Sequence, residues 1–372
     1  MTPGPRVSPA ARRLLLAAGV FGPAVLLEVG LDRFVADSSV RQLVMTAAIN
    51  VMIAASLNVI NGMAGQFSIG HAGFVGLGAY AAAIVASHLH LALGGGDPTF
   101  AHSLVVVPAA VAAGAAVASL AGVLVGLPSL RLKGDYLAIV TLGFAEMFRL
   151  VLTSVPLDAK SGVAGAIAKL GGQIGYSGAS GQGVPLYAGP LWVFGAASLI
   201  VVATWRIKFS GWGRALRALR EDEIAASAVG VDPTRYKVTS FVIAAFGAGV
   251  AGALSAIMRD GIGIVQPDQF DFRLSFDAIT MVILGGSGSI TGAVVGALFV
   301  TFTVKLIELA QGLDAVRLFQ SEHAWLDLNA LRMVLYASVL IALMIRRPEG
   351  LFGEREPLFA RKPRGAAPAG AA

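Results

Sequence analysis

Two asparagines in an apolar part of the chain are the first residues whose chemistry stands out. Asn58 follows Asn50 by eight residues, and Thr46 precedes Asn50 by four, so an α-helix would place the three side chains on one face. Amides that faced lipid would lack hydrogen-bond partners, so we expect this face to point into the protein. The face could line a pathway and exchange hydrogen bonds with a polar solute, or it could bond to neighbouring helices; both interpretations stay open.

A glycine-rich stretch, 61–73, holds three more polar candidates, Gln66, Ser68 and His71. Glycines permit close helix approach and an exposed backbone. The stretch therefore fits a broken, polar segment beside a solute path, of the kind that transporters use. It fits a tight turn between two helices equally well. With the two asparagines, these three residues make up the candidate substrate pathway.

Glu146 and Arg149 are opposite charges three residues apart within an apolar segment. Neither charge is tolerated alone in hydrocarbon, and a spacing of three places both on one helical face. We therefore expect a buried charge pair that holds the helices together. A proton or ion relay is the alternative, but the segment contains no string of acidic residues that would support one.

The longest strongly charged interruption between two apolar segments is 206–237, which carries seven Lys and Arg residues. Its spacings predict two short helices, the second with Glu223 in its first turn and Gly230 at its C-terminus. A soluble partner could grip this thin helix pair and move the membrane helices behind it; the alternative is a solvated loop that only sets topology. The residues expected to couple to the partner are Arg214, Arg217, Glu223, Ala225, Ala226 and Gly230.

Several kinds of site are excluded by what the sequence lacks. It has no cysteine, which rules out disulfides and thiolate chemistry, and its five histidines form no tight metal-ligand pattern. Residues 247–252 match the dinucleotide pattern GxGxxG, but they lie inside a continuous apolar segment. No Walker A sequence is present, so any ATP hydrolysis that drives this protein must occur in another subunit. The sequence predicts no catalytic, metal or cofactor site in this chain.

The elements that must hold these residues are apolar segments. Hydrophobic residues make up 56% of the 372 and charged residues only 13%, which would expose too much apolar surface in a soluble globule. The chain is therefore predicted to be an all-α polytopic membrane protein with about ten segments, of which 275–285 is a short, broken helix. The segments are 14–30, 42–60, 67–89, 103–127, 135–155, 189–205, 238–258, 275–285, 289–310 and 329–345.

The distribution of basic residues sets the expected orientation. With ten segments and an inner N-terminus, eighteen Lys and Arg residues fall on the inner side and seven on the outer side. The positive-inside rule then places both termini and 206–237 in the cytoplasm. In such a protein the net charge of +6 reports cytoplasmic loops rather than nucleic-acid binding.

The ends of the chain and one long connection complete the plan. We expect 1–13 to be a cytoplasmic N-terminus, 14–353 the transmembrane domain, with 14–30 as an uncleaved first helix, and 354–372 a disordered cytoplasmic tail. The outer connection 156–188 is rich in glycine. It could cover a pore mouth or seat an external partner, or it could be a loop without fixed structure.

Five stretches of the sequence are similar to those of a known family. They are GQFSIGHAGFVGLGAY (65–80), RLKGDYLAIVTLGF (131–144), GRALRALREDE with its continuation (213–230), MVILGGSGSITG (281–292) and RPEGLFG (347–353). The chain resembles permease subunits of ATP-binding-cassette importers for branched-chain amino acids, of the LivM type, over 42–353. Residues 153–163 depart from the family, which often has a Gly-Gly-x-x-Gly-Ile turn there.

The resemblance implies a fold, a mechanism and partners. The fold would be that of a large-type importer permease in the bacterial inner membrane, and Glu223, Ala225, Ala226 and Gly230 would belong to an EAA-type loop that the ATPases grip. The partners would be a second, related but non-identical permease chain, two cytoplasmic ATPases that bind ATP and Mg, and an external solute-binding protein. The chain itself would perform no chemistry and would move branched-chain or related hydrophobic amino acids inward by alternating access.

Two other functions remain in view. A permease of the same family could carry urea or short amides. A self-sufficient secondary transporter or channel would instead use an ion gradient through Glu146, Arg149 and the asparagines. The EAA-like loop favours the ATP-coupled importer over this last class.

Overall fold

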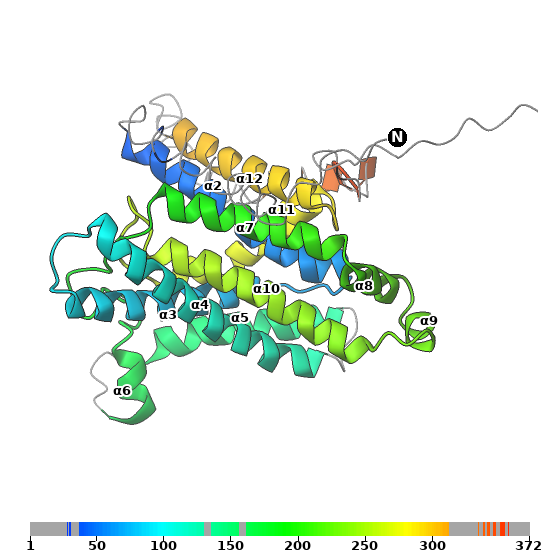
Figure 1. Ribbon diagram of the computed structural model, residues 1–372, viewed down its shortest axis with the longest axis horizontal. Helices are drawn as coiled ribbons and strands as arrows, with labels where there is room; N and C mark the ends of the chain where they lie inside the picture. Colours follow the sequence, from blue (N-terminus) through cyan, green and yellow to red (C-terminus); the bar gives the residue numbers. More distant parts are fainter. Residues whose placement is uncertain are drawn as a thin grey trace, which may run out of the picture.

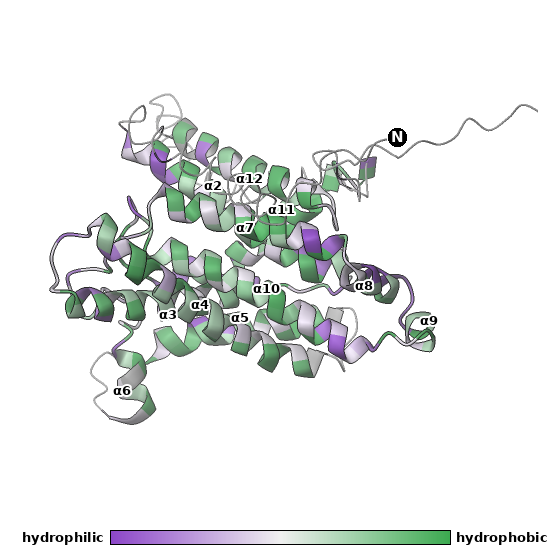
Figure 2. Cartoon of the chain, in the orientation of Figure 1, coloured by the Kyte–Doolittle hydropathy of each residue, from purple (hydrophilic) through white to green (hydrophobic). Residues whose placement is uncertain are grey.

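The computed structural model describes residues 28, 30, 37–129, 135–155 and 161–311, and then 334, 338, 341, 342, 345, 346, 350–353 and 356. The regular secondary structure of these residues is helical, apart from two isolated β-bridges. The long helices run side by side along one axis (Figure 1). The short helices α8 (Gly211–Glu221) and α9 (Glu223–Ala228) lie at one end, and α6 (Gly162–Ala168) lies at the other. Apolar residues dominate the helices, and hydrophilic residues gather around α8 (Figure 2).

The other helices follow the predicted apolar segments. Within the described residues six are long and apolar enough to cross a membrane: α2 (Ser38–Asn58, extended by the π-helix η1, Val59–Met63), α3 (His71–Ala92), α4 (Phe100–Ser129), α5 (Asp135–Ser154), α7 (Pro190–Lys208) and α10 (Pro233–Ala256). Two more helices, α11 (Phe272–Gly285) and α12 (Ile290–Gln311), follow them. The predicted segments 14–30 and 329–345 lie mostly outside the described residues. The polytopic, all-helical class is confirmed for the part of the chain that is described.

Some helices begin at other residues than the sequence predicted, and capping side chains explain two of these differences. The α10 helix begins five residues before the predicted 238, because the Asp232 carboxylate accepts the backbone N–H groups of Thr234 and Arg235 and proline occupies its first turn. Asp271 caps α11 in the same way. By contrast α3 begins later than 67, since Gly65 has a φ of +65° and the residues that follow it are not helical.

Glycines let α3, α4 and α10 pack backbone to backbone. A Cβ atom on Gly78 would lie 2.5 Å from the carbonyl oxygen of Gly249, and one on Gly114 would lie 2.7 Å from that of Gly78. Gly252, on the next turn of α10, faces the carbonyl of Val75 so closely that any Cβ would collide with it. Small residues of this kind are what helices in lipid use to approach each other. The GxGxxG pattern at 247–252 is therefore a helix-packing surface.

Replacing Gly252 by leucine is expected to separate α10 from α3. The added side chain has no space beside the Val75 carbonyl, and overpacking a tight core costs about 1–3 kcal/mol or more. We expect a lower midpoint of thermal unfolding in detergent and less folded protein on size exclusion. Gly143→Ala on α5 is the control, because a Cβ there meets nothing within 4 Å. Equal behaviour of the two variants would contradict this packing.

The α11 helix is the predicted short, broken helix. After α10 the chain passes through the 3-10 turn η2 (Pro267–Phe270), whose Phe270 ring lies edge-on to Tyr80 with centroids 6.4 Å apart. Tyr80 stands near the middle of α3, so α11 starts deep within the bundle rather than at its end. Its 14 residues then reach the end that carries α8. The hairpin to α12 is closed by Gly285 and Gly292, whose backbones touch.

The described part of the long connection, 161–188, is ordered. Tyr176 and Val265 exchange both backbone hydrogen bonds, at 2.8 and 3.1 Å, and the Val184 N–H donates to the Gly263 carbonyl at 2.7 Å. These bonds fasten the connection over the segment that leads into α11. For these residues the expectation of a loop without fixed structure is wrong, because their backbone groups are paired across two distant parts of the chain.

Candidate functional site

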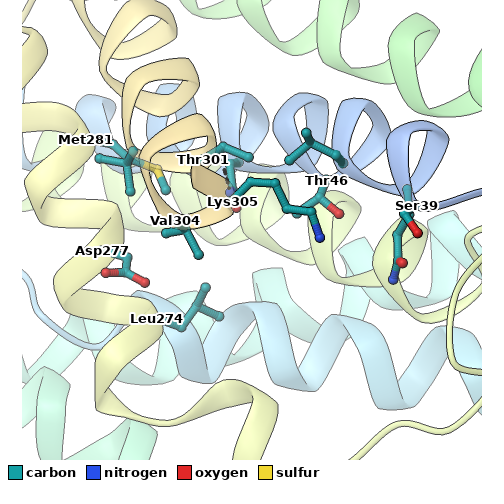
Figure 3. A pocket seen from close by; sticks show the side chains of 12 residues that line it. Ser39, Thr46, Leu274, Asp277, Met281, Thr301, Val304 and Lys305 are labelled. Carbon is teal, nitrogen blue, oxygen red and sulfur yellow. Dashed lines mark hydrogen bonds between the residues drawn. The ribbon is translucent and has the colours of Figure 1, made fainter. Parts of the chain in front are cut away.

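A cavity of about 360 Å³ lies between α2, α11 and α12 (Figure 3). Its lining residues from α2 belong to the half of that helix that lies away from α8 (Figure 1). From α2 it receives Ser39, Gln42, Thr46 and Asn50, which recur every three or four residues and so share one helical face. Its size falls within the range of about 300–1,000 Å³ that is common for small-molecule sites. The apolar part of its wall is made by Leu43, Leu274, Met281, Val300 and Val304.

Two charged residues line this cavity. Asp277 enters it from α11 and Lys305 from α12 (Figure 3). Ionisable side chains within spanning segments are costly, and they commonly mark the site of a substrate or ion. Neither residue was predicted from the sequence, because Asp277 and Lys305 are 28 positions apart and only the helical hairpin brings them to one cavity. The signal that could have found them is their charge in otherwise apolar helices.

Among the five predicted pathway residues, Asn50 lies in the cavity wall. Its side-chain amide donates to the hydroxyl of Thr301 at 2.8 Å, which ties α2 to α12. Asn58 lies at the C-terminal end of α2, where its amide donates to the Ser289 carbonyl and its oxygen accepts the Gly288 N–H. Asn58 thus holds the α11–α12 hairpin against α2, as the helix-bonding alternative describes.

The other three predicted pathway residues lie outside the cavity lining. The Ser68 backbone is held by the Asn61 side chain, Gln66 accepts from the Ser240 hydroxyl at 3.4 Å, and His71 Nε2 lies 3.0 Å from the Ser56 hydroxyl. All three side chains are buried. Ser68 Oγ and His71 Nδ1 are buried without a hydrogen-bond partner among the described residues, and 64–70 is a non-helical connection between η1 and α3. Both interpretations of 61–73, a polar segment beside a solute path and a turn between helices, therefore stay open.

Glu146 and Arg149 form an ion pair at 2.9 Å. Arg149 also reaches the Asp268 carboxylate of η2 at 3.1 Å, which the sequence analysis did not foresee. The expectation of a buried pair is not met within this chain, because the two side chains remain 27% and 25% exposed and Asp268 is 61% exposed. The three charges tie α5 to η2 beside the start of α11.

The charged stretch folds into the two predicted helices. The Asp222 side chain caps α9 by accepting from Ile224 and Ala225, and Glu223 stands in the first turn and pairs with Lys237 of α10 at 2.8 Å. Gly230 has a φ of +89° and ends the helix. The helix pair is therefore fastened to the start of α10 rather than hanging freely.

The outward face of α9 is not the one expected from its alanines. Ala226 is only 3% exposed within this chain, so its methyl group is not presented to a partner. Ile224 and Val229 are 83% and 79% exposed instead, and with Ala225 and Gly230 they form the surface of the tip. Arg214 is exposed on α8, and Arg217 faces a crevice beside Met63. Ala226 is thus corrected from a contact residue to part of the support of α9.

Arg220 connects α8 to the end of α2. Its guanidinium donates to the Gly62 carbonyl at 2.8 Å, inside η1, and its aliphatic stem packs on Gly65. The same guanidinium lies close to Gly288 of the α11–α12 hairpin. One side chain of the charged stretch therefore touches η1, which continues α2, and the turn between α11 and α12. These three helices line the cavity. A π-helix at the contact, η1, is a local irregularity of the type that is frequent at functional sites.

Glu356 fastens the same region from the far end of the chain. Its carboxylate accepts from the backbone N–H groups of Ile290 and Thr291, at 2.7 and 3.0 Å, and pairs with Lys208 at 2.6 Å. Burial alone would raise the pKa of Glu356, but the hydrogen bonds from Lys208 and from the start of α12 hold this pKa below its ordinary value. The tail 354–372 was expected to be disordered, but Glu356 is held in place by these contacts. Glu356 is the one residue of 354–372 that the structure describes.

Residues 350–353 extend this attachment. The N–H groups of Leu351 and Phe352 donate to the carbonyls of Leu284 and Gly285, at 3.0 and 3.1 Å, and so satisfy the open C-terminus of α11. Together, 350–353 and Glu356 form what we call the C-terminal clip, which caps α11 and α12 at their hairpin. No cluster of potential metal ligands occurs among the residues that the structure describes.

Comparison with known proteins agrees with this architecture. The model of a family described as branched-chain amino acid transport system / permease component matches residues 39–344. The chain is 32% identical over 327 residues to the high-affinity branched-chain amino acid transport system permease protein LivM of Escherichia coli (strain K12), covering 83% of this chain and 69% of that protein. The probable permease LivM of Methanocaldococcus jannaschii is 27% identical over 254 residues, 64% of this chain and 67% of its own. The permease LivH of E. coli K12 is 30% identical over 166 residues, 45% of this chain and 47% of its own.

Proposed function

The chain belongs to the family of permease components of branched-chain amino acid transport systems, and from this premise we propose that it imports branched-chain amino acids as one of two permease subunits coupled to ATPases. The observation that carries the proposal is the helix pair α8–α9. It stands between two spanning helices at one end of the bundle and connects through Arg220 to α2, a wall of the cavity. A substrate cavity at one end and a handle at the other are what an alternating-access subunit needs.

The proposed mechanism transmits motion along this connection. ATPases that bind ATP and Mg close against α8–α9, and Arg220 carries the displacement to η1 and the α11–α12 hairpin. Those elements seal the bundle below the cavity, where Asn58 holds Ser289 and Gly288. The chain supplies two conformations of differing affinity for the solute, and the ATPases bias the equilibrium between them.

The proposed assembly places partners at both ends and beside the bundle. The second permease is a related, non-identical chain, in keeping with the similarity of this sequence to both LivM and LivH proteins. A solute-binding protein docks at the end formed by α6 and the connection 161–188. The full subunit has about ten segments in the bacterial inner membrane, with both termini cytoplasmic.

Reconstituted transport tests the proposal. The purified complex in vesicles should take up L-leucine only when the ATPases and ATP are present on the α8–α9 side. Ile224→Asp and Val229→Asp should each leave the permease inserted and abundant, since both side chains are exposed, while ATPase pull-down and uptake fall together. Thr234→Ala, at an exposed position at the start of α10, is the control. Wild-type pull-down and uptake in both aspartate variants would remove α9 from the mechanism.

Orientation is tested by labelling a single cysteine. Because the chain contains no cysteine, Ser227→Cys places one thiol on the exposed face of α9. A membrane-impermeant maleimide should label it in inverted vesicles and leave it unmodified in intact cells. Labelling only in intact cells would reverse the topology.

The competing functions predict different results in the same vesicles. A secondary transporter or channel that used Glu146 and Arg149 would move solute along an ion gradient without ATPases. A urea or amide permease would require ATP but would show no leucine uptake.

A further inference from the structure

Asp277 and Lys305 give the cavity wall one acidic and one basic side chain. An amino acid in water is a zwitterion, with an ammonium group and a carboxylate on one carbon atom. The cavity wall carries one side chain of each opposite charge, from α11 and from α12, and both are partly buried. We propose that Asp277 receives the α-ammonium group and Lys305 the α-carboxylate of the transported amino acid, an inference that rests on the proposed import function.

The remaining wall suits the rest of such a solute. Met281, Val300 and Val304 supply apolar surface that a branched aliphatic side chain can contact. The cavity volume of about 360 Å³ accommodates a small amino acid with some water. Asn50 is already engaged with Thr301, so the amide is a poor candidate for the main contact to the solute.

This arrangement decides between the substrate classes of the family. Urea and short amides carry no charged groups, so each hydrogen bond they form with Asp277 or Lys305 has a charge on one side only. Hydrogen bonds to charged groups are stronger than those between neutral groups, so a zwitterion gains from both residues at once. The site therefore selects molecules that carry both charges over molecules that carry one or none.

Because the two residues stand on different helices, the solute also bridges them. The α11–α12 hairpin is the part of the cavity wall that Arg220 and the C-terminal clip contact at its opposite end. A shift of α11 relative to α12 changes the separation of the two charges and with it the affinity for a zwitterion of fixed size. The cavity thereby releases its solute when the hairpin moves.

A cysteine-protection experiment on the purified complex, without the external binding protein, tests the proposal. Thr46→Cys places a single reporter thiol in the cavity wall, and its rate of modification by a thiol reagent is measured with added solute. L-Leucine should slow the modification. Leucinamide, which lacks the carboxylate, and 4-methylpentanoate, which lacks the ammonium group, should need about ten- to a hundredfold higher concentrations for equal protection.

Variants assign the two contacts. Lys305→Met should abolish the preference for leucine over leucinamide, and Asp277→Asn the preference over 4-methylpentanoate, while Lys305→Arg and Asp277→Glu retain both in part. Arg273→Met, on α11 but outside the cavity lining, should keep the full preference. Where a variant does not assemble, the comparison of the three solutes in the complex without that variant still tests whether both charges of the solute are recognised.

Two outcomes overturn the inference. Equal protection by the three solutes would mean that the charges do not select the substrate. No protection by leucine in a complex that imports leucine would place the substrate elsewhere and leave the import function standing. A complex that imports no branched-chain amino acid under any condition refutes the import function itself, and uptake is therefore measured in every preparation.

Discussion

Replacing Arg220 by methionine is expected to lower ATP-driven uptake strongly in a complex that still assembles. The guanidinium donates to the Gly62 carbonyl at 2.8 Å and lies near Gly288. Arg220 is not part of the exposed surface of α9 that is proposed to bind the ATPases, so its replacement should leave assembly intact. A hydrogen bond from a charged group contributes about 1.5–3 kcal/mol, which corresponds to roughly a ten- to hundredfold loss of coupling. The measurement is uptake per ATP hydrolysed in reconstituted vesicles.

Two further variants serve as controls for this result. Arg206→Met removes a positive charge from an exposed position at the end of α7 and should leave coupling intact. Arg220→Lys keeps the charge without the planar fork and should restore only part of the coupling. Wild-type stoichiometry in Arg220→Met would show that motion reaches α2 by another route.

Replacing Glu356 by glutamine is expected to destabilise the hairpin end of the bundle. The side chains of Glu356 and Lys208 are each only 5% exposed, and breaking a buried ion pair from one side costs about 3–5 kcal/mol. We expect a lower unfolding midpoint and less membrane-inserted protein. Lys208→Met combined with Glu356→Leu should recover part of the stability, because no buried charge is then left unpaired. Glu221→Gln is the control, since its 76% exposed pair with Arg220 contributes little.

Glu356 also predicts a dependence on pH. Because its pKa is lower in the folded protein than its ordinary value of 4.5, the carboxylate contributes stability fully above that value. The contribution is lost as pH falls through the folded pKa. Wild-type protein should therefore lose more stability than Glu356→Gln between neutral pH and pH values below 4.5. Parallel pH curves for the two proteins would contradict the assignment.

The sequence was informative where a property is local. The composition and the apolar runs predicted the helices of the described regions, and the spacing of Glu223 and Gly230 predicted α9 with its left-handed end. The short length of 275–285 predicted the broken helix α11. Each of these follows from neighbouring residues, which is the range over which periodicity and capping operate.

Features that depend on contacts between distant parts of the chain could not be predicted from the sequence. Asp277 and Lys305 share a cavity only because the hairpin folds back, and Glu356 reaches Lys208 across 148 positions. Ala226 was assigned outward from its size, yet it is buried in the folded chain. Polar residues in 61–73 were equally compatible with a pathway and a turn, and their buried positions in the structure leave both interpretations open.

The C-terminal clip has a consequence for the order of biosynthesis. A ribosome completes α11 and α12 before it reaches 350–356, so both helices enter the membrane with the carbonyls of 284–285 and the N–H groups of 290–291 lacking their final partners. The C-terminal clip can form only after translation has passed Glu356. A nascent chain stalled before Gly350 should therefore be more accessible to membrane proteases at 284–291 than one stalled beyond the clip, even though both contain every helix of the cavity.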